Sequence, residues 1–411
     1  MKSTFLREMQ ERGYLNQCTD LDKLDSIVSK KSISAYIGFD CTANSLHVGS
    51  LLQIMILRLL QKHGHKPIVL LGGGTTLIGD PSGKDTTRKI LKQKDIKKNI
   101  TNIKKIFVKL LNFKSKTTKP VFVDNYTWLG KLNYIDFLRK IGSQFTLNKM
   151  LTFESVKSRL EREQSLSYME FNYMILQAFD FYKLYEKEKC ILQLGGSDQW
   201  GNIVSGVDLI RRIQKKDAFG LTSPLITLSS GAKMGKTEKG AVWLNEKLFS
   251  PYDYWQFWRN SDDKDVYRFL KFFTDIDVST ITKLEQTKDI NELKITLANE
   301  TTKILHGKVH SSRAEKIAAD VFKFGKINEN LPSKKIQRKD IETGMKLLEL
   351  LVVNKIMSSK SEARRAINNK GVKINDLLVA DENKTLNLSD FKDENLKISF
   401  GKKKHFLFKI I

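Results

Sequence analysis

Cysteine, histidine and long apolar runs are scarce in this sequence, and each scarcity excludes a class of protein. The three cysteines, Cys18, Cys41 and Cys190, are isolated and odd in number, so they indicate neither a disulfide framework nor a metal-binding spacing. The six histidines are scattered, which argues against a zinc site. No run approaches the ~20 apolar residues of a membrane span, and the acidic N-terminus, with Glu8 and Glu11, is unlike a signal or transit peptide. We therefore expect a cytoplasmic protein with no metal site and no membrane partner.

Acidic residues are also few, because 46 Asp and Glu face 71 Lys and Arg, giving a formal net charge of +25. A charge this large favours a polyanionic partner, with nucleic acid first. A second explanation stays open, because lysine far outnumbers arginine and Ile and Asn are frequent, as in AT-rich coding sequence. The length of 411 residues, 40% of them hydrophobic, predicts a globular protein of two or three domains.

Strands and helices alternate in the first half of the chain. Apolar runs over 33–39 and 67–71 predict strands, and the helical spacing of apolar residues between them predicts a helix over 49–63. A third strand over 190–194 precedes a helix over about 202–213. Glycine-rich loops follow the second and third strands. This order is typical of an α/β domain with a doubly wound, Rossmann-like parallel sheet, whose ligands lie beyond the carboxyl ends of the strands.

The second half has a different composition. From about Ser250, aromatic residues recur in helical segments, which predicts a helical domain running to about Lys326. Residues 328–333 then have the composition of a linker, and a small basic module follows. A separate stretch over 84–119 carries thirteen Lys or Arg and two acids. It is either a solvated, lysine-rich helix face or a surface for RNA, and the first is the ordinary expectation for a single lysine.

Two short clusters contain residues suited to phosphates. The first joins the strand over 33–39 to the next helix, where a carboxylate, a hydroxyl and an imidazole accompany backbone N–H groups that attract anions. The second is a glycine-rich segment in which two lysines, three residues apart, stand beside a threonine and can act as point charges on phosphates. In full, the clusters are Gly38-Phe39-Asp40-Cys41-Thr42-Ala43-Asn44-Ser45-Leu46-His47-Val48-Gly49-Ser50 and Lys233-Met234-Gly235-Lys236-Thr237.

A helix predicted over about 167–185 carries a line of polar side chains. Tyr173, Gln177 and Asp180 follow one another at i, i+4 and i+7 and share one face. Their neighbours are apolar, so much of this helix is expected to be buried. Because an unpaired buried polar group costs about 1–3 kcal/mol, the three side chains need partners. A small polar ligand and the neighbouring helices are equally suitable, and these residues alone do not decide between them.

The two clusters resemble the HIGH and KMSKS motifs of class I aminoacyl-tRNA synthetases, and the residues between and after them resemble bacterial-type tyrosyl-tRNA synthetases. The resemblance runs from about Tyr14 to Ile411 in the family's motif order. It implies that L-tyrosine reacts with ATP and Mg²⁺, without a tightly bound cofactor, and that the tyrosyl group passes to the 3′-terminal ribose of tRNA-Tyr. It also implies a homodimer, with the segment over about 126–162 at the interface.

The resemblance assigns a tyrosine pocket. Asp180 and Tyr36 would pair with the substrate phenol, so that a substrate without this hydroxyl would leave Asp180 unpaired; tyrosyl-tRNA synthetase is itself the standard example of this discrimination. Tyr173 and Gln177 would hold the amino group, and Asp80 would face it. The remaining tyrosine-binding residue in this expectation is Gln199.

The resemblance also assigns the ATP site. Thr42 and His47 would hydrogen-bond the phosphates, while Lys233, Lys236 and Thr237 would stabilise the leaving pyrophosphate. The other residues expected at the nucleotide are Gly38, Asp40, Gly49, Ser50, Gly196 and Asp198, the last of these at the ribose hydroxyls. This chain departs from the family motifs at three positions: Ser50 occupies the place of the family's second His, Gly235 that of a Ser, and Thr237 that of the last Ser. The first leaves one nucleotide contact weaker or differently made.

The C-terminal segment over 350–375 resembles a small RNA-binding fold named for a small-subunit ribosomal protein. The residues expected to contact an RNA backbone are Lys360, Arg364, Arg365 and Lys373. The predicted domains are therefore a catalytic domain over 1–240, a helical anticodon-side domain over 250–326 and an RNA-binding domain over 340–411.

Three alternatives differ in the residues they explain. A tryptophanyl-tRNA synthetase shares the fold, but Asp180 with Tyr36 favours a phenol. A non-catalytic RNA-binding protein on the same scaffold has no need of His47, Lys233 and Lys236, which are all present. A nucleotidyltransferase, such as a cytidylyltransferase, accounts for the His47 cluster but for neither the polar face over 167–185 nor the C-terminal module.

Overall fold

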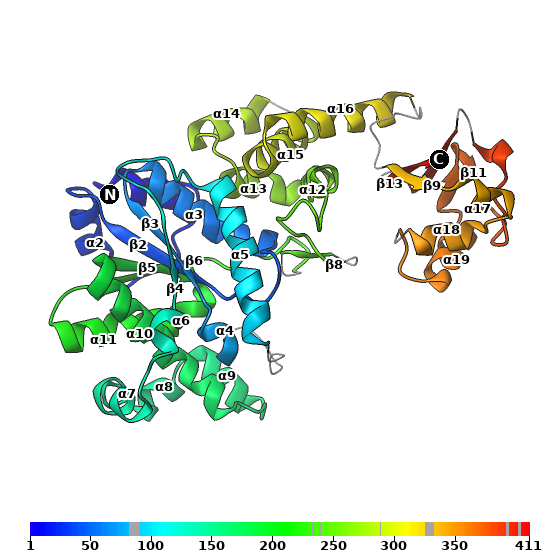
Figure 1. Ribbon diagram of the computed structural model, residues 1–411. Helices are drawn as coiled ribbons and strands as arrows, with labels where there is room; N and C mark the ends of the chain where they lie inside the picture. Colours follow the sequence, from blue (N-terminus) through cyan, green and yellow to red (C-terminus); the bar gives the residue numbers. More distant parts are fainter. Residues whose placement is uncertain are drawn as a thin grey trace. The chain divides into compact units, whose positions relative to one another are not determined.

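A computed structural model of the chain describes residues 1–81, 91–231, 234–237, 240–287, 289–324, 333–354, 356–391, 394–401 and 404–411. The chain forms two compact units, Met1–Ser311 and Ser312–Ile411 (Figure 1). The first unit contains the predicted parallel sheet together with the helices that follow it. The second unit contains a smaller sheet with its own helices.

The sheet of the first unit has six strands in the order β1-β6-β5-β2-β3-β4. The pairs from β6 to β4 are parallel, and β1 pairs with β6 in the antiparallel direction. Strand order reverses beside β2, which has β3 on one side and β5 on the other, so the doubly wound prediction is confirmed. The strands are β1 (Gln17–Cys18), β2 (Ser34–Phe39), β3 (Lys66–Leu71), β4 (Val121–Asp124), β5 (Cys190–Gly196) and β6 (Phe219–Ser223).

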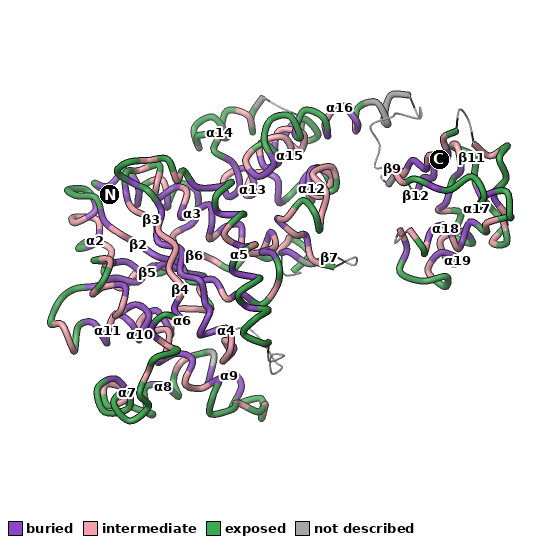
Figure 2. Tube along the Cα trace, viewed as in Figure 1, coloured by how far each residue is buried: buried purple, intermediate pink, exposed green. Residues whose placement is uncertain are grey.

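Helices cover the two faces of this sheet. On one face lies α3 (Leu51–Lys62), which contacts β2, β3 and β5, and α5 (Gln93–Leu110) packs against α3. On the other face, α10 (Tyr168–Glu188) and α11 (Trp200–Gln214) contact β5 and each other. Figure 2 shows the buried residues concentrated in the strands between these layers. Burial of the sheet on both faces explains the near-continuous apolar runs of its strands.

Shorter helices complete this part of the unit. Ser167 and Glu170 form a capping box that fixes the start of α10. The shorter helices are α1 (Thr4–Glu11), α2 (Leu21–Val28), α4 (Thr75–Ile78), α6 (Tyr126–Leu129), α7 (Tyr134–Lys140), α8 (Leu147–Leu151) and α9 (Glu154–Glu161). The short strands β7 (Lys236–Thr237) and β8 (Gly240–Ala241) form a separate antiparallel pair.

The aromatic-rich segment from Ser250 is helical, as the sequence predicts. Ser250 accepts a hydrogen bond from the Asp253 N–H and begins the first helix. The helices are α12 (Pro251–Arg259), α13 (Val266–Phe273), α14 (Val278–Thr287), α15 (Ile290–His306) and α16 (Lys308–Phe324). Trp258 packs against Phe269 and Phe273 in their core. Because α13 contacts α3 and α15 contacts α5, helices α12 to α15 belong to the same compact unit as the parallel sheet.

The second unit is built on a five-stranded sheet in the order β11-β10-β12-β13-β9. Its strands are β9 (Ser333–Ile336), β10 (Val372–Ile374), β11 (Leu377–Leu378), β12 (Asn395–Phe400) and β13 (Lys404–Ile410), and its helices are α17 (Arg338–Glu342), α18 (Leu347–Val353) and α19 (Lys360–Asn368). Strand β9 begins at Ser333, which the sequence predicts to be the last residue of a linker. The sequence does not reveal this strand, because a short, lysine-rich strand has the same composition as a linker. Residues 328–332 of that predicted linker lie outside the described residues.

One buried arginine joins the N-terminal segment to the end of α13. The Arg12 side chain is 3% exposed, and its Nε donates to Glu8 at 2.8 Å. Its Nη atoms donate to the carbonyl oxygens of Lys271 at 2.8 Å, Thr274 at 3.0 Å and Ile276 at 2.9 Å. Since the last carbonyls of a helix have no partner within the helix, Arg12 satisfies acceptors that would otherwise be buried and unpaired.

We predict that Arg12→Leu lowers the free energy of unfolding by about 3–5 kcal/mol, because it leaves the Glu8 carboxylate and several carbonyls with fewer partners. The measurement is urea unfolding followed by circular dichroism. Arg7→Leu, a change of the same kind at an exposed position of α1, is the control and should cost less than about 0.5 kcal/mol. Equal losses in the two variants would contradict the role given to Arg12.

Candidate functional site

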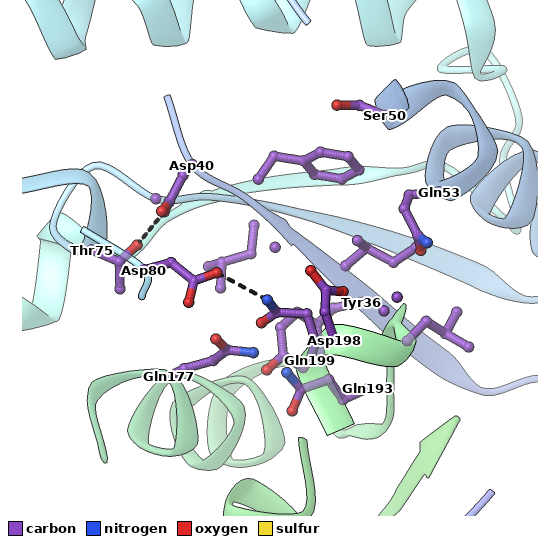
Figure 3. A pocket seen from close by; sticks show the side chains of 18 of the residues that line it. Tyr36, Asp40, Ser50, Gln53, Thr75, Asp80, Gln177, Gln193, Asp198 and Gln199 are labelled. Carbon is purple, nitrogen blue, oxygen red and sulfur yellow. Dashed lines mark hydrogen bonds between the residues drawn. The ribbon is translucent and has the colours of Figure 1, made fainter. Parts of the chain in front are cut away.

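A cavity of about 300 Å³ opens at the carboxyl ends of β2 and β5 (Figure 3). This is the point where the strand order of the sheet reverses, and ligands of open α/β sheets bind at such points. The predicted site residues that line the cavity come from β2, the loops after β2, β3 and β5, the start of α3, and α10. They are Tyr36, Gly38, Asp40, Gly49, Ser50, Asp80, Tyr173, Gln177, Asp180, Gly196, Asp198 and Gln199.

Asp180 is the most deeply buried carboxylate of the cavity. It is 1% exposed, and it accepts hydrogen bonds from Trp128 Nε1 at 2.7 Å and from Asn125 Nδ2 at 2.8 Å. Burial raises the pKa of Asp180 from its ordinary value of 3.8 to about 7; the two hydrogen bonds oppose this shift, and the nearby Asp40 and Asp124 add to it. The cavity therefore ends in a carboxyl group whose charge is sensitive to pH and to the ligand.

The Tyr36 hydroxyl is a second buried polar group in the cavity wall. Tyr36 is fully buried, with its ring 5.3 Å from that of Phe181. Among the described residues, no hydrogen-bond partner reaches the hydroxyl. A buried hydroxyl without a partner costs free energy, so a polar ligand group beside Tyr36 would restore the missing hydrogen bond. Tyr36 and Asp180 are both parts of the same cavity wall.

A chain of hydrogen bonds connects Asp180 to Asp40. Asn125 uses one amide group to donate both to Asp180 and to Thr75 Oγ1, the latter at 3.1 Å. Thr75 in turn donates to Asp40 Oδ1 at 2.9 Å, and Tyr173 donates to Asp40 Oδ2 at 3.2 Å. The two ends of the cavity thus share one network, which fixes the orientation of each carboxylate.

A second network holds the polar groups on the remaining side. Gln199 Nε2 donates to Asp80 Oδ2 at 2.9 Å. The buried Asn202 donates to Gln177 Oε1 and Gln199 Oε1, both at 3.1 Å. Figure 3 shows Gln177, Asp80 and Gln199 on neighbouring parts of the wall. The amide groups of Gln177 and Gln199 are therefore held in place before any ligand binds.

Several residues of these networks are absent from the sequence-based prediction. Asn125 and Trp128 position Asp180, Thr75 positions Asp40, and Asn202 positions the two glutamines. Asn125 directly follows β4, a four-residue strand over Val-Phe-Val-Asp that the sequence reading does not identify. If that strand is recognised, Asn125 becomes a candidate site residue, because a polar side chain directly after a parallel strand lies at the edge of the sheet where ligands bind.

The two phosphate-type clusters, nearly 190 positions apart, pack directly against each other. Gly49 N donates to His47 Nδ1 at 3.0 Å, and a Cβ atom on Gly235 would lie only 2.6 Å from the same Nδ1. Gly235 also has φ of +106°, which favours glycine. The backbone of Val242 links the clusters by donating to Gly235 O at 3.1 Å and accepting from Val48 N at 2.9 Å. Glycine at 235 is thus required by the contact with His47.

Two of the predicted catalytic residues, His47 and Thr42, are not among the residues that line the cavity. His47 is half-buried beside it, and Thr42 is exposed in the same loop. Lys236 and Thr237 form β7, which directly follows the buried Met234 and Gly235. Lys233 lies outside the described residues.

The residues predicted to bind RNA all lie on the surface of the second unit. Lys360, Arg364 and Arg365 are on α19, and Lys373 is on β10. All four side chains are exposed. Lys360 pairs with Glu349 at 3.0 Å and Arg364 with Glu382 at 3.3 Å. Exposed ion pairs of this kind are weak, so both cations can exchange their partners for phosphates.

Two further properties apply to the part of the chain that the structure describes. No described helix is both long and apolar enough to cross a membrane. The described histidine, cysteine, aspartate and glutamate side chains form no group arranged to hold a metal ion.

The raised pKa of Asp180 predicts a pH dependence of stability. The unfolded chain loses this proton near pH 4, whereas the folded protein keeps it until about pH 7. The contribution of Asp180 to the free energy of unfolding is therefore complete below pH 4 and is lost as the pH rises toward 7. In urea unfolding between pH 4 and 8, the wild type should lose of the order of 4 kcal/mol relative to Asp180→Asn. Parallel pH profiles for the two proteins would refute the burial argument.

Comparison with known proteins places this geometry in a family. Residues 29–323 match the family described as tRNA synthetases class I (W and Y), and residues 324–408 match the Tyrosine--tRNA ligase SYY-like C-terminal domain. The tyrosine–tRNA ligase of Pelagibacter ubique is 58% identical over 407 residues, which are 99% of each chain, and that of Rickettsia felis is 53% identical over 410 residues, 99% of this chain and 100% of the relative.

A solved structure agrees with these sequence relatives. The C-terminally truncated mitochondrial tyrosyl-tRNA synthetase of Aspergillus nidulans superimposes with a TM-score of 0.70 at 28% identity, over 77% of this chain and 94% of that one. Since the family match covers most of the chain and the relatives extend over nearly all of it, this protein belongs to the class I tRNA synthetases of the tryptophan and tyrosine group.

Proposed function

We infer that the chain joins tyrosine to tRNA, and that its cavity first converts L-tyrosine and ATP to tyrosyl-adenylate. This proposal rests on two groups in one cavity wall: the buried carboxyl group of Asp180 and the hydroxyl of Tyr36, which has no hydrogen-bond partner among the described residues. A substrate phenol can donate to Asp180 and accept from Tyr36. The high identity to tyrosine–tRNA ligases supports the same substrate.

The other polar groups of the cavity suit the amino-acid end of the substrate. Asp80 offers a carboxylate to the ammonium group, and the amide of Gln177 and the hydroxyl of Tyr173 offer further acceptors. Gln199 holds Asp80 by a hydrogen bond of 2.9 Å. The substrate carboxylate is left free to react, because none of these groups is a cation that would bind it.

ATP fits the opposite end of the cavity. Gly38, Gly49 and Gly196 let a nucleotide approach the backbone, and Asp198 is a carboxylate acceptor suited to ribose hydroxyls. Asp40 and Ser50 complete this side. Phosphates then extend toward the contact between the two clusters, where we assign phosphate binding to Thr42, His47, Lys233, Lys236 and Thr237. Mg²⁺ accompanies ATP as a complex with its phosphates.

The reaction is a displacement at phosphorus followed by acyl transfer. An oxygen of the tyrosine carboxylate attacks the α-phosphorus, the bond from the α-phosphorus to the bridging oxygen breaks, and pyrophosphate leaves. A hydroxyl of the 3′-terminal ribose of tRNA-Tyr then attacks the carbonyl carbon, and AMP leaves with the electron pair of the mixed anhydride. Catalysis in the first step is positioning and charge stabilisation, and no protein nucleophile is needed.

We assign RNA binding to the second unit. The exposed cations suited to a sequence-tolerant contact with an RNA backbone are Lys360, Arg364, Arg365 and Lys373.

We assign the protein to the cytoplasm. The three cysteines are free thiols, which suits a reducing compartment in which tRNA is charged.

Tyrosine-dependent ATP–pyrophosphate exchange tests the activation step. We predict exchange with tyrosine and only background exchange with tryptophan or phenylalanine, because a ligand without a phenol leaves the Tyr36 hydroxyl without a partner and gives Asp180 no donor beyond Trp128 and Asn125. Tyr36→Phe should raise the KM for tyrosine about 3- to 10-fold, the value of one neutral hydrogen bond, and leave the KM for ATP unchanged. Tryptophan-dependent exchange would reassign the substrate. A folded wild type that binds RNA without any exchange would favour the non-catalytic alternative.

We also propose that two copies of the chain associate through the segment over 126–162. Large apolar side chains are exposed on α7 and α8, including Tyr134 at 59%, Ile135 at 60% and Leu147 at 65%, and burying them against a partner would be favourable. A second copy covers this surface without requiring any other partner, because a twofold interface brings together the same patch from each subunit.

Ile135→Asp should convert a dimer to a monomer, because it places a charge in the proposed apolar interface. Sedimentation velocity of the wild type should give about twice the chain mass, and the variant about one chain mass. Val309→Asp, at a side chain that is 79% exposed on α16, is the matched control and should remain dimeric. A wild type that sediments as a monomer would refute the proposal.

A further inference from the structure

Helix α5 carries a lysine face that the proposed reaction does not use. We define this face as Lys94, Lys97, Lys98 and Lys105, which follow one another at i, i+3, i+4 and i+11 and therefore share one side of the helix. All four residues are exposed. The opposite side of α5 is apolar and buried, and its residues are Ile96, Ile100, Ile103, Ile106, Phe107 and Leu110.

The beginning of this face is electrostatically unfavourable for the helix itself. Lys94, Lys97 and Lys98 lie in the first two turns, where the helix dipole favours anions and disfavours cations. They also stand three and four residues apart, at spacings where like charges repel. Asp95 is the one acid in the first turn, and Lys92 at the N-cap provides no side-chain cap. A bound anion would remove this repulsion, which makes the arrangement one expected of a binding surface.

Within the described part of the chain, the ammonium groups at this end of the face also have no protein counter-ions. Among the described residues, no carboxylate and no hydrogen-bond acceptor pairs with the side chains of Lys94, Lys97 or Lys98. At the other end of the same helix, by contrast, Lys109 pairs with Glu246 at 2.9 Å. The cations of the first two turns are therefore available to a ligand.

The first turns of α5 lie on the side of the sheet where the cavity opens. Helix α5 lies between the parallel strands β3 and β4 in the chain, so it begins at the carboxyl edge of the sheet and runs back toward the amino edge. Asn99 donates to the carbonyl of Cys41 at 2.8 Å, and Asn102 donates to Asn44. Both partners belong to the loop that follows Asp40. Figure 1 shows α5 running from α4 toward the helical segments.

We propose that the lysine face of α5 binds backbone phosphates of the acceptor end of tRNA and guides the 3′-terminal ribose into the cavity. This proposal rests on the proposed function, because the polyanion that must approach this cavity is the RNA strand whose terminal ribose is acylated. Flexible ammonium groups on an exposed face bind phosphates as point charges and read no sequence. The contact is therefore sequence-tolerant and depends on salt.

The test uses three variants of the full-length chain. In K94Q/K97Q/K98Q the charges are removed with little change in helix propensity. In K114Q/K116Q/K119Q the same number of charges is removed from exposed lysines beyond the other end of α5. In K94R/K97R/K98R the charges are kept. Each protein is assayed for tyrosine-dependent ATP–pyrophosphate exchange and for aminoacylation. The Kd of each protein for unmodified tRNA-Tyr is also measured at salt concentrations from about 0.05 to about 0.3 M.

We expect K94Q/K97Q/K98Q to keep exchange, to lose about 10-fold or more in kcat/KM for tRNA and in tRNA affinity, and to reduce the slope of log Kd against log salt by about 2 to 3. The other two variants should resemble the wild type. An unchanged tRNA Kd in the first variant, or an equal loss in the second, would overturn the proposal. The binding assay does not depend on catalysis, so a wild type without exchange would count against the proposed function alone.

Discussion

The burial of Asp180 is the constraint on which the rest of the cavity depends. A carboxyl group at 1% exposure is tolerated only with partners, and Trp128 and Asn125 supply them. Asn125 itself is held by accepting from Gly74 N at 2.7 Å, so the loop after β3 and the loop after β4 must both be in place. The same amide reaches Thr75 and, through it, Asp40. One buried carboxyl therefore fixes the geometry at both ends of the site.

A second constraint comes from close packing between loops. The His47 ring lies so near Gly235 that any side chain at position 235 would collide with it. Met234, beside it, is 5% exposed, so this short segment is packed before ATP binds. The lysines assigned to the leaving pyrophosphate flank a fixed pair of residues. The second cluster, over 233–237, is therefore held in place at Met234 and Gly235, and its two lysines stand on either side of this pair in the sequence.

The fold was predictable where periodicity was strong. The strands β2, β3 and β5 and the helices α3, α10 and α11 are long and apolar, and the sequence locates them to within a few residues. The short strands β1, β4 and β9 escape such a reading, since two to four residues carry little pattern. Most cavity residues were predictable because motif residues follow long strands or lie on one face of α10. Asn125 and Trp128 were not, because their role depends on a contact with Asp180 across 50 or more positions of sequence.

The shared network has a consequence for how specificity can change during evolution or design. Replacing Asp180 with an apolar residue would leave Trp128 Nε1 and one amide hydrogen of Asn125 without acceptors, and it would also loosen the hold on Thr75. A single substitution therefore loosens the network at Asp40, which we assign to the nucleotide, while it removes the carboxyl group that we assign to the substrate phenol. A change of amino-acid specificity therefore requires coordinated substitutions at Asp180, Asn125 and Trp128. Variants that carry only one of these substitutions are expected to activate neither the old nor the new amino acid well.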